Sequence, residues 1–215
     1  MELPFSQSQF LEVFAAYNVA IWPLQIATLL LGVLAVALVF SACRWSHRII
    51  SAVLALLWTL MGVGYHWLYF SAVNPAAWFF GGLFVLAASV FLIEGTIRDR
   101  IRFRPRTGIS GWVATVLIVY GIAVYPATSL LVTHPYPQTP LFGVAPCPTT
   151  IFTLGMLLLA RHPKPLLLAA LPIIWSLIGA SAAFLLDMPQ DLALIVAAAT
   201  WFACHPPSSE KGDRF

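Results

Sequence analysis

Apolar runs separated by short polar loops dominate the chain. A helix crosses the hydrocarbon core of a bilayer with about 20 apolar residues, and six runs reach or approach that length. They are Trp22–Cys43, Ile49–Phe70, Ala76–Thr96, Gly111–Thr133, Pro165–Leu186 and Pro189–His205. Pro126 is expected to bend the helix over Gly111–Thr133, and Pro172 the helix over Pro165–Leu186. This pattern predicts an all-α, polytopic bundle of transmembrane helices.

The fifth segment of the bundle breaks this pattern. Pro146-Cys147-Pro148 interrupts it, so only Pro148–Ala160 is expected as continuous helix, about 20 Å long at 1.5 Å per residue. Because the hydrocarbon core is about 30 Å thick, the chain from Leu141 to Pro146 should enter it in irregular form. Irregular backbone is tolerated there only where protein buries it or where it lines a wet cavity. The alternative is a tilted, kinked helix in a locally thinned bilayer.

The chain ends are expected to lie outside this bundle. Phe10, Val13 and Phe14 share one face of the segment from Ser6 to Tyr17, and Glu12 lies on another. That segment is too short to span, so residues 1–17 are predicted to form an amphipathic segment at the interface. No basic cluster precedes an apolar run, so no cleavable signal peptide is expected. Residues 18–205 would form the bundle, and residues 206–215 a polar cytoplasmic tail.

Basic residues fall in alternate loops and predict the orientation. The loops around Asn74, from His134 to Pro140 and from Asp187 to Asp191 contain no Lys or Arg. With about seven spans, every basic cluster lies on one side, which the positive-inside rule makes the cytoplasm. The clusters are Arg44 with Arg48, Arg98 to Arg106, Arg161 with Lys164, and Lys211 with Arg214. The N-terminus would then lie outside and the C-terminus inside.

Composition supports a membrane protein and excludes other classes. The 215 residues are 60% hydrophobic and 9% charged, against about 25% charged in a soluble domain, so a water-facing surface could not be covered. The net charge of +3 comes from the topology-setting clusters, and no nucleic-acid partner is expected. The sequence predicts the lipid bilayer and a small solute or ion as partners. An oligomer or a partner subunit is left open.

The start of the fifth helix is the first candidate site. Pro146-Cys147-Pro148-Thr149-Thr150 places a thiol, two hydroxyls and free N–H groups at a helix N-terminus, which suits an anion or a polar ligand. Broken helices of this kind form binding sites in many transporters. Alternatively, Thr149 caps the helix and Cys147 is a small buried hydrophobe.

The outer end of the second span is the other candidate. His66 is the one ionisable side chain well inside an apolar run, which makes it a functional candidate by default. Its neighbours Trp67, Tyr69 and Phe70 equally fit an interfacial aromatic belt. The ligand-binding residues predicted from both segments and the outer loops are Tyr65, His66, Asn74, His134, Cys147, Thr149 and Thr150.

Metal and cofactor chemistry find little support in the chain. His66, His134 and Cys147 have side chains that suit Zn²⁺ or copper, but their spacing matches no metal motif, and no metal site is predicted. No span contains the lysine that retinal needs, and no carboxylate lies mid-span, which argues against a proton-coupled antiporter with a relay at the membrane centre. Nucleotide-binding loops, HExxH and GxSxG are absent. The cofactor, if one exists, stays unknown, and whether the protein is an enzyme stays open.

Three stretches carry a resemblance. They are Gly64-Tyr65-His66-Trp67-Leu68-Tyr69-Phe70, Asn74-Pro75-Ala76-Ala77 and Pro146-Cys147-Pro148-Thr149-Thr150-Ile151-Phe152-Thr153. The chain resembles an uncharacterised bacterial family of multi-span membrane proteins over most of its length, and the Cys-Pro-Thr-Thr stretch is the most specific part. The resemblance implies a bacterial inner-membrane protein and brings with it no activity, substrate or catalytic residue.

Three hypotheses about function follow, in this order. The first is a small-solute or ion transporter or channel with an outward-facing pocket at the broken start of helix five. The second is an enzyme or redox component at the outer face that uses Cys147 as nucleophile or His66 as ligand. The third is an accessory subunit that only contacts partners.

Overall fold

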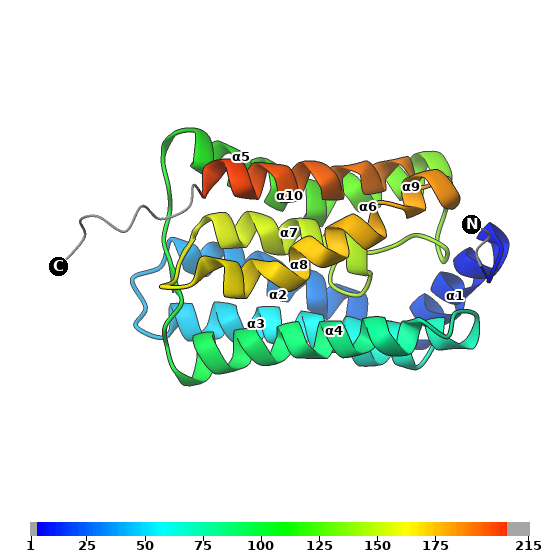
Figure 1. Cartoon of the computed structure of the whole chain (residues 1–215), viewed down its shortest axis with the longest axis horizontal. Helices are drawn as coiled ribbons and strands as arrows, with labels where there is room; N and C mark the ends of the chain where they lie inside the picture. Colours follow the sequence, from blue (N-terminus) through cyan, green and yellow to red (C-terminus); the bar gives the residue numbers. More distant parts are fainter. Residues whose placement is uncertain (1–3, 206–215) are drawn as a thin grey trace.

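Helices account for nearly all regular structure in residues 4–205, the part of the chain that the computed structural model describes, apart from the side chains of residues 132 and 133. They run side by side along one long axis, and the chain ends lie at opposite ends of the bundle (Figure 1). The all-α prediction is confirmed. The predicted tail, residues 206–215, lies outside the described residues.

Four helices of the described residues are long and apolar enough to cross a membrane. They are Ser46–Ala72, Ala77–Ile97, Gly108–Leu131 and Pro165–Leu185. The predicted boundaries of these four differ from the observed ones by at most three residues. Their parts are α3 (Ser46–Thr59), η1 (Leu60–Trp67), η2 (Phe70–Ala72), α4 (Ala77–Val90), η3 (Phe91–Ile97), α5 (Gly108–Val119), η4 (Tyr120–Val124), α6 (Tyr125–Thr128), η5 (Ser129–Thr133), α8 (Pro165–Gly179) and α9 (Ala182–Leu185).

The first predicted span is shorter than expected. Helix α2 covers Leu24–Val39, and it meets α1, Gln7–Ala20, at 87°. Only together are the two helices long and apolar enough to cross a membrane. The described residues therefore contain at most five candidate spans by length and composition. Ser6 is the N-cap of α1 and forms a capping box with Gln9. The Ser6 hydroxyl accepts the Gln9 N–H, and the Gln9 side chain accepts the Ser6 N–H.

Helix α1 lies across one end of the bundle, as its angle to α2 requires (Figure 1). Its apolar face packs on protein: Phe14 stacks on Tyr65, with ring centroids 4.8 Å apart, and Phe10 meets Phe70 edge-on at 5.9 Å. The face that the sequence pattern assigns to the membrane interface therefore contacts the C-terminal end of η1 and η2.

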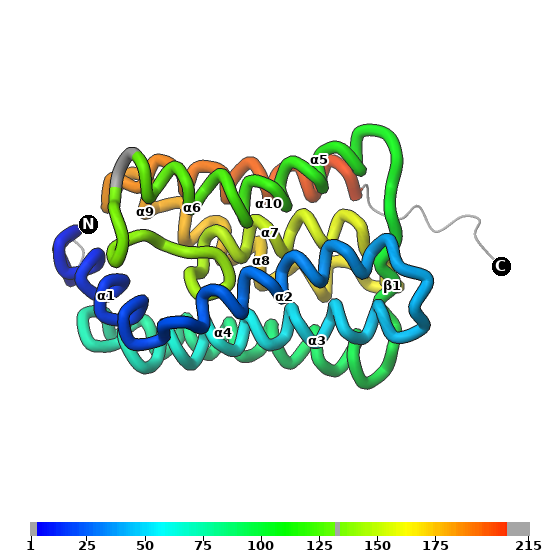
Figure 2. The backbone as a smooth tube through the Cα atoms, turned by 180° about the vertical axis from the view of Figure 1, so that it is seen from behind, coloured from blue at the N-terminus to red at the C-terminus, as the bar shows by residue number. Residues whose placement is uncertain are grey.

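The fifth segment is a short helix, α7, which covers Pro146–Leu158. It starts two residues earlier than predicted, because the first three positions of a helix need no intrahelical N–H bond and tolerate proline. Every residue of α7 except Cys147 is buried, and α5, α8 and α10 (Leu192–Cys204, preceded by η6, Pro189–Asp191) pack around it. The chain ahead of α7 enters the bundle in irregular form (Figure 2), and Phe142 to Ala145 are buried, as predicted.

Small residues allow two helices to approach closely. A Cβ on Gly62 would lie 2.9 Å from the Gly81 carbonyl oxygen, and a Cβ on Gly81 would lie 2.9 Å from the Gly62 oxygen. These two glycines therefore bring η1 and α4 into backbone contact. Gly82, the next residue of α4, has no neighbouring atom within 4 Å of such a Cβ.

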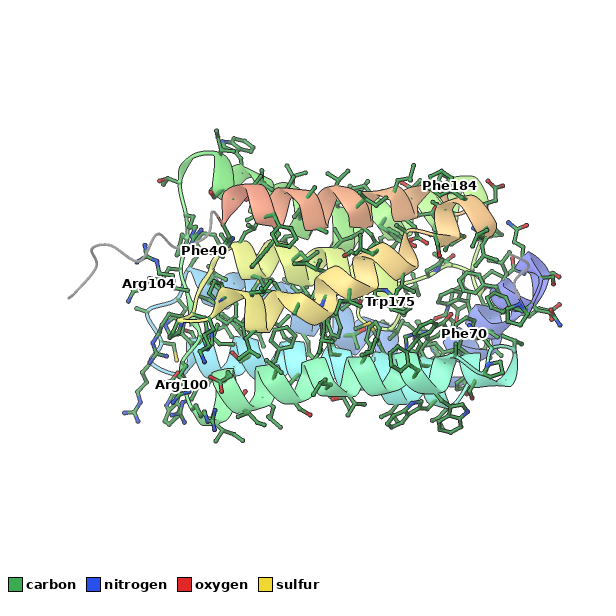
Figure 3. The ribbon with its side chains drawn as sticks, viewed as in Figure 1. Phe40, Phe70, Arg100, Arg104, Trp175 and Phe184 are labelled. Carbon is green, nitrogen blue, oxygen red and sulfur yellow. The ribbon has the colours of Figure 1, made fainter. Side chains whose placement is uncertain are left out.

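The basic loops meet at the end of the bundle opposite α1, where Figure 3 labels Arg100 and Arg104. There β1 (Arg102–Phe103) pairs antiparallel with β2 (Ala160–Arg161), which joins the loop after η3 to the loop after α7. Asp99 forms ion pairs with Arg48 and Arg102. The Arg102 hydrogen bond, helped by both positive charges, holds the pKa of Asp99 below its ordinary value.

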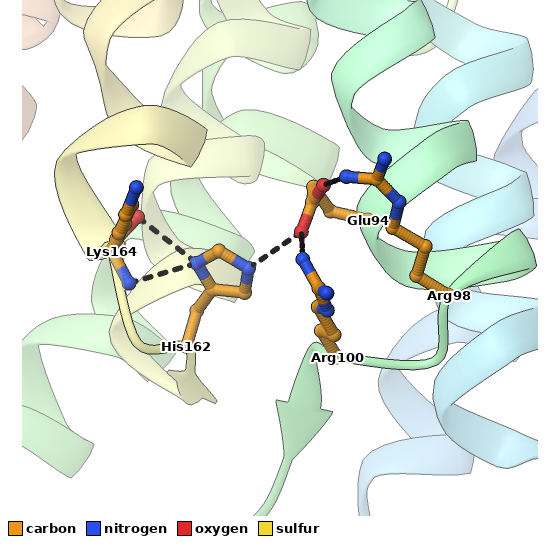
Figure 4. Close-up of polar contacts among 5 residues, drawn as sticks. All are labelled: Glu94, Arg98, Arg100, His162 and Lys164. Carbon is orange, nitrogen blue, oxygen red and sulfur yellow. Dashed lines mark hydrogen bonds and ion pairs between the residues drawn. The ribbon is translucent and has the colours of Figure 1, made fainter.

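Glu94 is the acidic centre of this end (Figure 4). Its carboxylate accepts hydrogen bonds from Arg98 at 2.5 Å and from Arg100 at 3.4 Å, and His162 Nε2 lies 3.3 Å away. The ion pair with Arg98, four residues on, gives Glu94 a structural role. The network ties the end of η3 to the loop before α8.

Candidate functional site

A cavity lies at the bundle end that α1 covers, opposite the basic loops, and has a volume of about 150 Å³. We call it the aromatic cavity, because aromatic rings from several helices line it. The rings come from α1, from η1 and η2, from α4 and from α8, and they include Phe10, Phe14, Tyr65, Phe70, Phe80 and Trp175. Figure 3 labels Phe70 and Trp175, which lie on different helices in this half of the bundle. Phe70, assigned to a belt by the sequence pattern, is 5% exposed and faces this cavity.

Few polar groups line the aromatic cavity, and one of them lacks a strong partner. Trp175 is 7% exposed, and its Nε1–H has no oxygen or nitrogen acceptor within the described residues; the Cys147 sulfur, a weak acceptor, lies beside it. A buried donor without a strong acceptor costs free energy, so a ligand that supplies an acceptor would be favoured here. Asn74 and Cys147 line the same cavity; the Asn74 side-chain oxygen accepts the Ala76 N–H at 3.1 Å.

Cys147 lies at the first turn of α7 and links the aromatic cavity to a second polar group. A Cβ built on Gly179 would lie 3.5 Å from Cys147 Sγ and 3.2 Å from Trp175 Nε1, so the thiol and the indole N–H both lie beside this glycine. The thiol also lies close to the Asp191 carboxyl group. Asp191 is 1% exposed, although the sequence pattern places it in an outer polar loop.

The Asp191 carboxyl group receives a hydrogen bond from the Tyr125 hydroxyl, with 2.5 Å between the oxygens. Asp191 lies at the start of the last predicted span and not in its middle, and it is nevertheless enclosed by protein. The sequence does contain a signal, since Pro189-Gln190-Asp191 directly precedes an apolar helical run, the usual place of an acidic N-cap. We call Tyr125, Cys147 and Asp191 the acid cluster.

Thr149 and Thr150 do not line the aromatic cavity. The Thr149 hydroxyl accepts the Gly143 N–H and donates to the Ala145 carbonyl, each at 2.8 Å, so it holds the irregular chain before α7. Thr150 is fully buried, and its hydroxyl has no partner among the described residues. Pro146 and Pro148 have no N–H, and the Ala145 N–H bonds the Leu141 carbonyl. The Cys147 N–H is therefore the free donor of the first turn. This start offers an anion less than the sequence pattern predicts.

His66 lies behind the cavity wall. It is fully buried, its Nδ1 lies 2.9 Å from the Met61 carbonyl oxygen, and its Nε2 has no partner in the described residues. Its ring meets Trp175 edge-on, with centroids 5.1 Å apart, and packs against Phe84 at 4.7 Å. His66 therefore positions the Trp175 ring and does not itself line the aromatic cavity.

His134 lies in the loop after η5 and is not part of the aromatic cavity. Burial lowers the pKa of His134 from its ordinary value, and the Asp187 charge opposes this shift. Within the described residues, no group of three His, Cys, Asp or Glu side chains is arranged to hold a metal ion. His66, His134 and Cys147 are thus not brought together. The aromatic cavity unites Tyr65, Asn74 and Cys147 from the predicted set.

The helices, their apolar outer surface and an internal cavity define the class of a polytopic helical membrane protein. Large apolar side chains are widely exposed, for example Ile109 at 80%, Trp112 at 74% and Phe184 at 76%. The chain belongs to a family of unknown function, DUF6064, whose model matches residues 7–204. This membership confirms the resemblance to an uncharacterised family. No match is found among curated proteins or among solved structures.

Proposed function

We propose that the protein is a seven-span protein of the bacterial inner membrane that transports or conducts a small solute through the aromatic cavity. The observation that carries the proposal is the Trp175 N–H, which has no oxygen or nitrogen acceptor within the described residues and lies beside the Cys147 thiol in a cavity of about 150 Å³. A ring-lined cavity of this size suits a molecule about as large as benzene. The Trp175 donor adds one hydrogen-bond acceptor to the description of the solute.

The proposed orientation has the aromatic cavity outside and the basic loops in the cytoplasm. It is supported by the position of the arginines at the end opposite α1. Exposed rings at both ends, Trp22, Trp78 and Phe184 at one and Phe40, Trp45 and Trp112 at the other, would suit the two membrane interfaces. The shorter helices α2, α7 and α10 supply the remaining three spans, with α7 enclosed by protein.

Two native cysteines test this arrangement, because they lie at opposite ends. Variants that keep Cys147 alone or Cys43 alone would be treated in intact cells with a membrane-impermeant maleimide. We expect the reagent to modify Cys147, which lines the cavity. We expect exposed Cys43, which follows α2 at the basic end, to react only after the membrane is permeabilised. Modification is measured by the mass of the purified protein.

The opposite result has a clear meaning. If Cys43 reacts in intact cells, the orientation is inverted. If Cys147 reacts only after denaturation, the cavity does not open outward, and the accessory-subunit hypothesis takes precedence. Cys204, which would be replaced by serine in both variants, is partly buried and would otherwise complicate the masses.

The class of solute is tested at Trp175. Para-fluorobenzyl alcohol is a neutral, ring-sized probe with one oxygen acceptor, and fluorine NMR reports its bound signal. We expect Trp175→Phe, which removes the N–H and keeps an aromatic ring, to weaken binding about two- to tenfold, the value of one net hydrogen bond. Trp201→Phe is the matched control, because Trp201 is also buried, with an N–H that lacks an oxygen or nitrogen acceptor in the described residues, but does not line the cavity.

Equal affinity in the wild type and both variants would mean that the Trp175 N–H does not recognise the probe. Signal that comes only from probe dissolved in detergent, unchanged by addition of the wild-type protein, would contradict a solute site in the aromatic cavity.

A further inference from the structure

The acid cluster contains a buried carboxyl group that the proposed solute site does not use. Asp191 lies at the end of η6, directly before α10, and is 1% exposed. Its interactions are the hydrogen bond from the Tyr125 hydroxyl at 2.5 Å and the contact with the Cys147 thiol. Asp191 is not among the residues that line the aromatic cavity, whereas its neighbour Cys147 is.

No positive charge balances Asp191 within the described residues. The ion pairs of that part of the chain involve Glu94 and Asp99, which both lie at the basic end. The titratable groups around Asp191 are Tyr125 from α6, Cys147 from α7, Tyr120 from η4 and Tyr65 from η1, and none of them is a cation in any state. An ionised carboxylate in such surroundings is costly unless a cation neutralises it.

A proton is the cation that this geometry can accept. Tyr125 donates its O–H to Asp191 Oδ1, so the second oxygen, Oδ2, is the atom left to carry a proton. The proton comes from water at the outer end of the bundle and returns to water, and no electrons move. Tyr125 keeps its own proton in both states and stabilises the carboxylate when Asp191 is ionised.

Cys147 connects this proton to the aromatic cavity. The thiol lines the cavity and also touches the Asp191 carboxyl group. A solute in the cavity displaces water from the other side of that thiol and lowers the local dielectric constant around Asp191. The neutral, protonated carboxyl group is then favoured over the ionised one, so proton binding and solute binding assist each other.

We propose that Asp191 is a proton-binding site whose occupancy is coupled to the solute in the aromatic cavity, so that solute and proton bind together. The coupling rests on the proposed function of the cavity, whereas the proton site itself does not. Membrane transporters commonly place an ionisable residue of this kind inside the bundle.

Infrared spectroscopy tests the proton site without any solute. The carboxylic-acid C=O stretching band of the purified wild type would be followed from about pH 4 to about pH 9, a range above the ordinary pKa of Asp. We expect a band that titrates in this range and is missing in Asp191→Asn, whose amide oxygen can still accept the Tyr125 hydrogen bond. Asp187→Asn is the matched control, because Asp187 lies nearby in the sequence and is exposed. In this variant the titrating band assigned to Asp191 should be unaffected.

A titrating band that persists in Asp191→Asn would overturn the proton site, as would the absence of any titrating band in the wild type. If Asp191→Asn does not yield a monodisperse protein, Tyr125→Phe decides instead: loss of the Tyr125 donor must move the midpoint of the band by about half a pH unit or more, and an unmoved midpoint contradicts the assignment.

The coupling is tested with para-fluorobenzyl alcohol. We expect the saturating probe to move the midpoint of the Asp191 band to higher pH by about half a unit or more. By linkage, the probe should bind at least about threefold more tightly at low pH than at high pH, and this difference should vanish in Asp191→Asn. An affinity that is independent of pH, with a band that titrates, overturns the coupling. A probe that does not bind the wild type at any pH overturns the proposed function, and the infrared result still decides the proton site.

Discussion

Alanine at Gly121 is expected to destabilise the protein by about 3 kcal/mol, at the upper end of what overpacking costs. The added Cβ would lie 2.5 Å from the Pro148 carbonyl oxygen and 2.9 Å from the Phe152 nitrogen, which are backbone atoms of α7. Backbone inside an enclosed helix cannot yield as a flexible side chain can. For a chain of this size the loss corresponds to a fall in melting temperature of about 10 °C, measurable on the detergent-purified protein by thermal unfolding.

Gly82→Ala provides the control on the same scale. Gly82 is helical, in α4, and an added Cβ there has no atom within 4 Å. It should leave the melting temperature unchanged or raise it slightly, because alanine favours a helix by up to about 1 kcal/mol over glycine. Equal melting temperatures for Gly121→Ala and Gly82→Ala would contradict this prediction. They would show that η4 and α7 can separate without cost.

Alanine at Gly143 is the second change with a large expected effect, about 2 to 5 kcal/mol. Gly143 has φ +80°, where a side chain costs about 1 to 2 kcal/mol. Its added Cβ would also lie 2.5 Å from Thr28 Cβ on α2, which adds about 1 to 3 kcal/mol of overpacking. Since the Gly143 N–H holds Thr149, the start of α7 and the position of Cys147 should be disturbed as well.

Gly108→Ala separates the two costs. Gly108 has φ +73° but open space around an added Cβ, so its alanine variant measures the backbone term only. Thermal unfolding should show a clearly larger loss for Gly143→Ala than for Gly108→Ala. Similar losses would mean that α2 moves away from the irregular chain at little cost.

The spans could be predicted because burial in lipid needs only length and apolarity, which are properties of a continuous run. The short α7 could also be predicted, since Pro146 and Pro148 limit where a helix can begin. The turn between α1 and α2 agrees with a separate N-terminal segment, but the packing of the apolar face of α1 on Tyr65 and Phe70 could not be predicted, because the same pattern also suits a membrane interface. The orientation rule and the seven-span count concern the membrane and remain predictions.

The site was harder to predict than the spans. Tyr65, Asn74 and Cys147 are polar groups in apolar surroundings, and their meeting in the aromatic cavity follows from how α1, η2 and α7 end at the same level of the bundle. Asp191 was expected as a polar group of a loop without Lys or Arg and not as a buried one, because its position before α10 shows where a helix begins but not which way the side chain turns. Trp175 resembled any lipid-facing aromatic residue, since an N–H without a strong acceptor is visible only when its neighbours are known.

The enclosure of α7 has a consequence for how the protein is made. A helix of 13 residues whose sides are covered by protein gains little from lipid, so it is a weak substrate for insertion by itself. Its entry into the bilayer then depends on α3 and α5, made before it, and on α8 and α10, made after it. Assembly of the proposed seven-span form would therefore be a cooperative step late in biosynthesis. Helix α7 would be the last helix to leave the machinery that inserts helices into the bilayer.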